Sequence, residues 1–162
     1  MASEEQVVMG VSHRPTQLSI NAFERCLPDI IADIERSRKE WRHIDGVWPH
    51  VPGLSDQELT RHIHILTHLK EVRVAELTYG KAIFGKIELP GVNDPELGQG
   101  YVHVRLHHGV GTSEESITFH SIRITGFDVG PDGHAHHWHA IQAGDTPLEW
   151  FDAEKDATAS AE

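Results

Sequence analysis

"YVHVRLHH" (residues 101–108) alternates apolar and polar side chains without interruption, and this pattern decides the fold class. Successive side chains of a β-strand point to opposite faces, so a period of two predicts a strand with one apolar face. The apolar face would carry Val102, Val104 and Leu106. The other face would carry Tyr101, His103, Arg105 and His107. We therefore expect a sheet that buries one face of this strand against a core.

The segments on either side of this strand also have strand character. "AIFGKIEL" (82–89) is a candidate first strand, and the Gly- and Pro-rich residues 90–100 predict a loop after it. "ITFHSIRITGFDV" (117–129) predicts a long strand, and its apolar phase shifts in a way that indicates a β-bulge near His120 and Ser121. After a turn at 130–133, residues 134–142 would return as the hairpin partner.

Residues before the strands show helical spacing instead. Residues 19–44 carry one apolar stripe that runs through Pro28 without a change of phase, which favours one kinked, continuous helix with a capping box at Asn21 and Glu24. A linker (45–54) follows, in which Trp48 is expected to pack against the core. A second helix is predicted from Ser55 to about Leu77.

The order of these elements predicts an α+β fold. Two N-terminal helices would pack on one face of a C-terminal antiparallel meander sheet of three to four strands. We expect an irregular or loosely strand-like segment at 1–18, a single α+β domain at 19–152 and a disordered tail at 153–162.

Composition narrows the function classes for this chain of 162 residues. A formal net charge of −11 argues against nucleic-acid partners, and no apolar run is long enough to span a membrane. The single cysteine, Cys26, excludes an internal disulfide framework and suits a small core residue. With no signal-peptide pattern at the start, these features predict a cytoplasmic protein.

The 14 histidines are the unusual feature of the composition, and four of them lie in "GHAHHWHAI" (133–141). On a strand, His134 and His136 share one face, and a His-x-His pair of this kind can bind one metal ion. Further ligands would come from neighbouring strands. The candidate metal ligands are His134, His136, His139, His103, His107 and His120. Because imidazole suits divalent transition metals, the cofactor would be Zn, Fe, Ni or Cu. Alternatively, these histidines are structural and bond to other protein groups.

A second group of possible ligands lies in "RHIHILTHLKE" (61–71). His64, His68 and Glu71 would share one face of the second helix, where two imidazoles and a carboxylate can form a facial triad. The alternative is a polar outer face of that helix. No pattern for nucleophilic catalysis or phosphate binding is present, so the catalytic residues stay unidentified.

Three functions follow from these patterns. The first is a small, cytosolic, histidine-rich metal-binding protein, which as a metal-dependent enzyme would act on a small molecule. The second is a non-catalytic accessory or assembly subunit that contacts a protein partner or forms a homo-oligomer. This function predicts an exposed apolar patch at "PLEWF" (147–151). The tryptophans would anchor the partner (Trp41, Trp48, Trp138 and Trp150). The third is a metal-free, cone-shaped α+β enzyme whose pocket histidine works with an acid in proton transfer.

Overall fold

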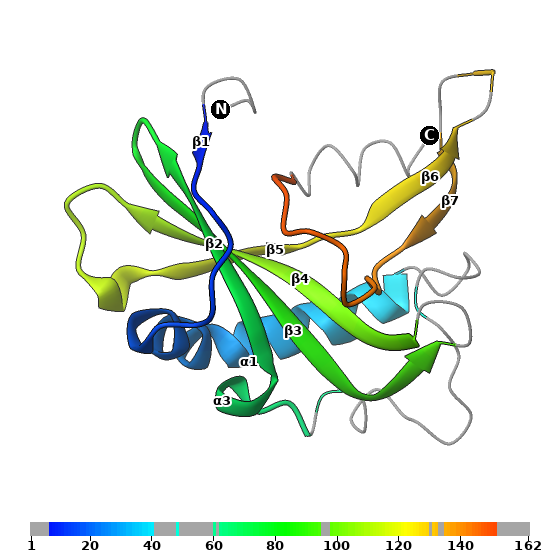
Figure 1. Ribbon diagram of the computed structural model, residues 1–162, viewed down its shortest axis with the longest axis horizontal. Coiled ribbons are helices and arrows are strands. Elements are labelled where there is room, and N and C mark those ends of the chain that lie inside the picture. Colours follow the sequence, from blue (N-terminus) through cyan, green and yellow to red (C-terminus); the bar gives the residue numbers. More distant parts are fainter. Residues whose placement is uncertain are drawn as a thin grey trace.

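The computed structural model describes residues 7–40, 48, 60, 62–94, 98–129, 131–132 and 135–151, with the side chains of 94, 125–129 and 135–138 left out. These residues form a five-stranded antiparallel sheet in the order β1-β2-β3-β4-β5, with one long helix across one face and a hairpin, β6–β7, at the end (Figure 1). The elements are β1 (Val8–Met9), α1 (Gln17–Glu40), α3 (Ile65–His68), β2 (Leu69–Leu77), β3 (Gly80–Asp94), β4 (Gly98–Gly109), the 3-10 helix η2 (Glu114–Ser116), β5 (Thr118–Ile122), β6 (Thr125–Val129) and β7 (Ala135–His139). The predicted α+β class is confirmed, but the main sheet has five strands where three to four were predicted, because β1 and β2 add to it before the predicted first strand.

Strand β4 contains the alternating stretch and pairs with β3 on one side and β5 on the other. Val102, Val104 and Leu106 are fully buried on the side that faces α1, which we call the helix face. His103 and Arg105 point to the opposite side, the outer face, and are buried as well. A polar face that is also buried was not expected from the alternation, and it makes the outer face a place to look for function.

Helix α1 is continuous through Pro28, as predicted, and buries the expected stripe at Phe23, Cys26, Ile30 and Ile34. The predicted capping box is wrong, because the helix begins earlier. Thr16 and Ser19 cap it instead: the Thr16 amide donates to Ser19 Oγ at 2.8 Å and the Ser19 amide donates to Thr16 Oγ1 at 3.2 Å. Among the described residues, no helix has the length and apolar character needed to cross a membrane.

The predicted second helix is wrong over its C-terminal half. Only α3, four residues long, is helical there, and residues 69–77 form strand β2. Leu, Lys, Glu and Ala in this segment favour a helix locally, yet Val72 and Val74 alternate with Arg73 and Ala75. Pairing with β3 along most of its length buries Val72 and Ala75, so long-range burial outweighs local propensity. The predicted start at Ser55 lies outside the described residues.

The later strands differ from the predictions in two places. The long strand predicted at 117–129 is divided into β5 and β6, which pair in different sheets. The expected loop at 90–100 is largely strand, because β3 continues to Asp94 and β4 begins at Gly98, with a register shift between Glu88 and Asn93. The predicted bulge is confirmed: Ser121 pairs with Arg105 and Phe119 with Leu106, which leaves His120 as the extra residue. The predicted hairpin is also present as β6–β7. The expected disordered tail at 153–162 lies outside the described residues.

Hydrophobic side chains cover both faces of the sheet. The larger core lies between α1 and the helix face, where Trp48 packs as predicted and donates from Nε1 to Ser37 Oγ at 2.9 Å. A smaller core on the outer face forms where both chain ends cross the sheet, around Phe84 of β3, with Leu148 and Phe151 buried and Met9 partly buried. The apolar patch predicted at "PLEWF" is therefore wrong as an exposed surface, because Phe84 points outward and this segment covers it.

Gly85 provides a direct test of the packing between α1 and β3. A Cβ atom at Gly85 would lie 2.4 Å from Cζ of Phe23, whose ring is fully buried. We expect Gly85→Ala to lower the free energy of unfolding by about 1–3 kcal/mol, measured by urea denaturation, because the ring has no free space to move into. Adding Phe23→Leu to Gly85→Ala should recover part of the loss relative to the sum of the two single changes.

Gly109→Ala is the matched control, since a Cβ there meets its nearest neighbour, Cγ2 of Thr112, at 3.4 Å. This change should shift the free energy of unfolding by no more than about 0.5 kcal/mol. Equal changes in the free energy of unfolding for Gly85→Ala and Gly109→Ala would show that Phe23 does not pack closely against β3.

Candidate functional site

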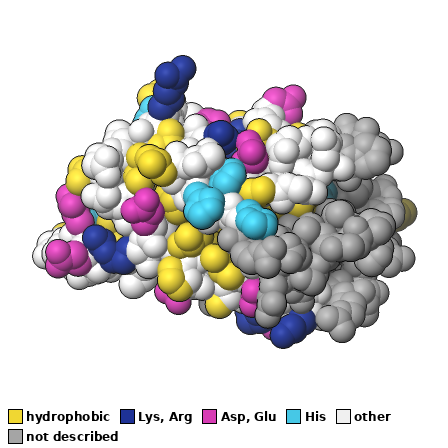
Figure 2. All heavy atoms as spheres, turned by 90° about the horizontal axis from the view of Figure 1, so that it is seen from below, with side chains coloured by type: hydrophobic (Ala, Val, Ile, Leu, Met, Phe, Trp, Pro, Cys, Tyr) yellow, Lys and Arg dark blue, Asp and Glu magenta, His cyan; other side chains and the backbone are white. Residues whose placement is uncertain are grey.

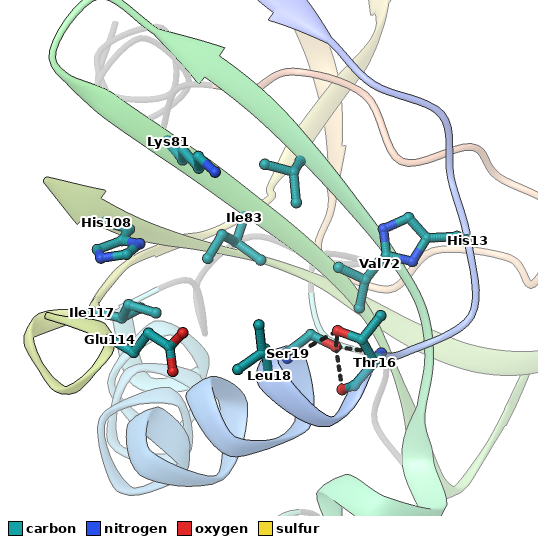
Figure 3. Close-up of a pocket in the computed structure, with 11 residues that line it drawn as sticks. His13, Thr16, Leu18, Ser19, Val72, Lys81, Ile83, His108, Glu114 and Ile117 are labelled. Carbon is teal, nitrogen blue, oxygen red and sulfur yellow. Dashed lines mark hydrogen bonds between the residues drawn. The ribbon is translucent and has the colours of Figure 1, made fainter. Parts of the chain in front are cut away.

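A cleft of about 310 Å³ opens between the first turn of α1 and the helix face of β2 and β3 (Figure 3). Its volume lies in the range of small-molecule pockets. The apolar lining consists of Leu18, Val72, Val74, Ile83 and Ile117. The polar lining consists of His13, Thr16, Ser19, Lys81, His108 and Glu114. The cleft thus combines an apolar floor with several polar groups.

The start of α1 explains why this space stays open. Farther along the helix, Phe23 fills the space between α1 and Gly85 of β3. In the first turn, the side chains that line the cleft are those of Leu18 and Ser19. Ser19 is short, and its hydroxyl donates back to the Thr16 carbonyl at 2.8 Å. Leu18 is 60% exposed at the entrance. Small or outward-pointing side chains therefore leave room over the apolar residues of β2 and β3.

Two histidines of the cleft have their tautomers set by main-chain carbonyls. His13 Nδ1 lies 2.7 Å from the Arg14 oxygen, and His108 Nε2 lies 3.1 Å from the Thr112 oxygen. Because a carbonyl oxygen only accepts, each of these nitrogens carries the proton in the neutral ring. The lone pair is then on His13 Nε2 and on His108 Nδ1. Each ring has one nitrogen that can take up a proton.

Glu114 provides a carboxylate on the same side of the cleft as His108 (Figure 3). It lies in η2, which α1 holds in place because Arg25 Nη1 donates to the Glu114 carbonyl oxygen at 2.7 Å. An imidazole and a carboxylate at one pocket are the groups that acid–base chemistry uses most often.

Of the predicted metal ligands whose side chains the structure describes, His103 is the most buried. It is fully buried on the outer face, across the sheet from the cleft, and neither ring nitrogen has a hydrogen-bond partner among the described residues. Burial, together with the charges of Arg123 and Lys86, lowers the pKa of His103 to about 3. The ring is therefore neutral at physiological pH.

His139 lies near the same guanidinium. Its side chain is half-buried, and burial and the charge of Arg123 lower its pKa against the opposing effect of a hydrogen bond with Gln142. His103 and His139 therefore both lie close to the guanidinium of Arg123.

The other predicted ligands lie apart from this pair. His107 is four residues from His103, about 13 Å along a strand, and its ring lies 6.3 Å from that of Tyr79. Burial, Arg105 and His108 lower the pKa of His107. His120 is exposed at the bulge, with Nδ1 2.7 Å from Ser121 Oγ.

Within the part of the chain that the structure describes, no three or more His, Cys, Asp or Glu side chains are grouped closely enough to hold a metal ion. His134 and the side chain of His136 lie outside the described residues. The metal-site hypothesis, which depends on these two residues, stays a prediction.

The predicted facial triad on the second helix is wrong, because α3 ends at His68 and Glu71 belongs to β2. The rings of His64 and His68 stack with centroids 6.1 Å apart, and the His64 amide donates to His68 Nδ1. Histidine side chains gather on the face of the molecule shown in Figure 2. Glu71 instead forms an ion pair with Lys86. Burial opposes the ionisation of Glu71, but hydrogen bonds from Ser12 and Lys86 outweigh it and lower the pKa of the Glu71 carboxyl group.

Sequence reasoning missed the residues of the cleft. Only the Thr16-x-x-Ser19 spacing, a capping signal, could have placed the true start of α1 and the space beside it. His13 carries no local signal, because its position depends on its pairing with Val72. His108 does carry one, since the alternation puts this polar residue on the same face as Val102, Val104 and Leu106, but only the pairing of His108 with Lys81 brings it to the cleft. Neither a protein-family model, nor a curated protein sequence, nor a solved structure matches this chain, so its functional assignment depends on this geometry alone.

Proposed function

We propose that this protein binds a small, largely apolar molecule in the cleft at the start of α1. The observation that carries the proposal is the cleft itself, whose apolar floor is bordered by a few polar groups at its edge. The apolar part of the ligand would lie against Val74 and Ile83. Its polar part would lie near His108 and Glu114.

The same residues support the metal-free enzyme among the three functions considered from the sequence. His108 Nδ1 would act as the base that accepts a proton from the ligand, and the Glu114 carboxylate would stabilise the resulting imidazolium. His13, on another side of the cleft, offers a second basic nitrogen. The suitable substrate class is a compact apolar molecule with one acidic proton next to a polar group.

We also propose a cellular location and a class of partners for this protein. A cytoplasmic location suits Cys26, which is buried and unpaired, and whose thiol pKa is raised by burial and by Asp29. Partners would be small molecules or a second copy of the chain, and not nucleic acid, given the net charge of −11. Metal binding by His134 and His136 would be a separate property.

Binding of anilinonaphthalene sulfonate, which joins an apolar body to an anionic group, tests the cleft. We expect the dye to bind the wild-type protein saturably, measured by fluorescence titration. Val74→Phe should weaken binding by roughly tenfold or more, equivalent to about 1.4 kcal/mol, because the added ring occupies the cleft. If Val74→Phe impairs folding, Leu18→Trp at the entrance serves the same purpose.

Val110→Phe is the matched control. Val110 is 68% exposed and lies outside the cleft lining, so this change should leave dye affinity unchanged. Equal affinity in Val74→Phe, Leu18→Trp and the wild type would rule out the cleft as the binding site.

A further inference from the structure

We propose that the outer face of the sheet carries a second binding site, specific for a small oxyanion, formed by Lys86, His103 and Arg123 beneath the C-terminal strap (residues 143–151). This site lies across the sheet from the cleft and does not depend on the function proposed for the cleft.

The three side chains form one row across the sheet. Lys86 of β3 pairs with His103 of β4, and the Arg123 amide donates to the His103 carbonyl oxygen at 2.9 Å. Directly opposed residues of neighbouring strands project from the same face with Cβ atoms about 5 Å apart. The imidazole of His103 therefore stands between an ammonium group and a guanidinium group.

Several hydrogen-bonding atoms of this row are buried without a partner. Both ring nitrogens of His103 and Nη1 of Arg123 have none in the part of the chain that the structure describes. Buried polar atoms of native proteins are almost always hydrogen-bonded, and leaving one unpaired is costly. The oxygens of a carboxylate or a phosphate would accept hydrogen bonds from the imidazole N–H and from the guanidinium together.

The charge of the row favours an anion over a metal ion. Among the described residues, Glu71 contacts Lys86 at 3.1 Å, whereas the carboxylate that pairs with Arg123, that of Glu149, is 3.9 Å away and 58% exposed. Two cations thus face one close carboxylate. Because Arg123 also lies close to His139, a divalent cation bound by His103 and His139 would meet an unfavourable charge there.

The strap covers this row through replaceable contacts. Lys86 Nζ donates to the Gly144 carbonyl oxygen at 2.8 Å, and Arg73 Nη1 donates to that of Leu148 at 2.7 Å. A charged oxygen accepts a hydrogen bond from a cation more strongly than a neutral carbonyl does. An anion can therefore displace Gly144, which is exposed, while Leu148 and Phe151 keep the rest of the strap in place.

Nuclear magnetic resonance of the histidine ring nitrogens tests this site. Sodium acetate and sodium phosphate would each be titrated into the full-length protein at constant ionic strength, with sodium chloride as the reference salt. We expect a saturable change in the His103 ring signals with at least one of the two oxyanions. Arg123→Gln should weaken this binding at least roughly tenfold. Arg36→Gln, an exposed arginine on α1, is the control and should leave it unchanged.

Each outcome decides the proposal. Saturation by acetate alone identifies a carboxylate ligand, by phosphate alone a phosphorylated ligand, and by both a site that recognises oxyanion charge. No saturable change with either salt, or an equal affinity in Arg123→Gln, would overturn the proposal. If Arg123→Gln does not fold, Lys86→Gln takes its place, with the same two outcomes.

Discussion

Replacing His103 by leucine is expected to stabilise the protein at pH 7 and to reduce the dependence of its stability on pH. The imidazole is fully buried and neither ring nitrogen has a partner among the described residues, so the wild-type protein bears the cost of two unsatisfied polar atoms. Leucine removes those atoms at similar volume. We expect the free energy of unfolding to rise by about 1–3 kcal/mol, measured by urea denaturation in a chloride-containing buffer.

The pH effect follows from the lowered pKa of His103. Its pKa is about 3 in the folded protein and 6.5 in the unfolded chain, so between these values only the unfolded chain binds the proton. The stability contributed by the neutral ring is complete above pH 6.5 and is lost as the pH falls toward 3. Between pH 7 and pH 5 the wild-type protein should lose about 2 kcal/mol through His103, and His103→Leu should not show this part of the loss.

His120→Leu is the matched control for this experiment, because His120 is exposed. It should not raise the free energy of unfolding at pH 7 as His103→Leu does. Some slope will remain in His103→Leu, since the pKa values of His107 and His139 are also lowered. A His103→Leu protein that is less stable than the wild type at pH 7, with an unchanged slope, would mean that His103 has a partner in solution.

Among substitutions on the outer face, Phe84→Ala is expected to lower the stability of the protein most. The ring is fully buried at the centre of the smaller core, with ring centroids 5.4 Å from Phe151 and 5.9 Å from Trp150. Truncation of a buried phenylalanine costs about 3–5 kcal/mol, so the unfolding midpoint in urea should fall markedly. The strap should also open locally, which amide hydrogen exchange of residues 143–151 would detect as lost protection.

Phe23→Ala separates these two effects. Phe23 is equally buried but lies on the helix face, so its loss should lower global stability by a similar amount. The strap contacts of Arg105, whose guanidinium lies 4.3 Å from the Trp150 ring and donates to the Phe151 carbonyl at 3.2 Å, would stay intact. If both variants expose the strap equally at the same global stability, the smaller core does not hold the strap as a separate unit.

The sequence was informative where its pattern was local. The alternation in residues 101–108 and the apolar stripe of residues 19–44 led to β4 and α1, because each element buries the face that its period defines. The phase shift near His120 was enough to predict the bulge. For β2 the local preference and the final structure conflict, since its composition favours a helix and only its pairing with β3 makes it a strand.

The site was harder to predict for a related reason. The cleft joins His13, α1, β2, β3 and η2, which are distant in the sequence, and no spacing rule connects them. Alternation correctly placed His103 and Arg105 on one face, but it suggested that this face would be polar and open. The segments that cross this face, which include Met9 and residues 143–151, bury it. Apolar residues such as those at 147–151 resemble an interaction surface when read from the sequence alone.

The position of Arg73 has a consequence for how the chain reaches its final state. Its guanidinium donates to the Gly10 carbonyl at 2.6 Å and to the Leu148 carbonyl at 2.7 Å, so one side chain of β2 holds segments from both ends of the protein. During synthesis on the ribosome, the first of these contacts can form long before the second. The part of the outer face beneath the strap therefore stays uncovered until residue 151 has left the exit tunnel, and a nascent chain shorter than this exposes Phe84 to chaperones.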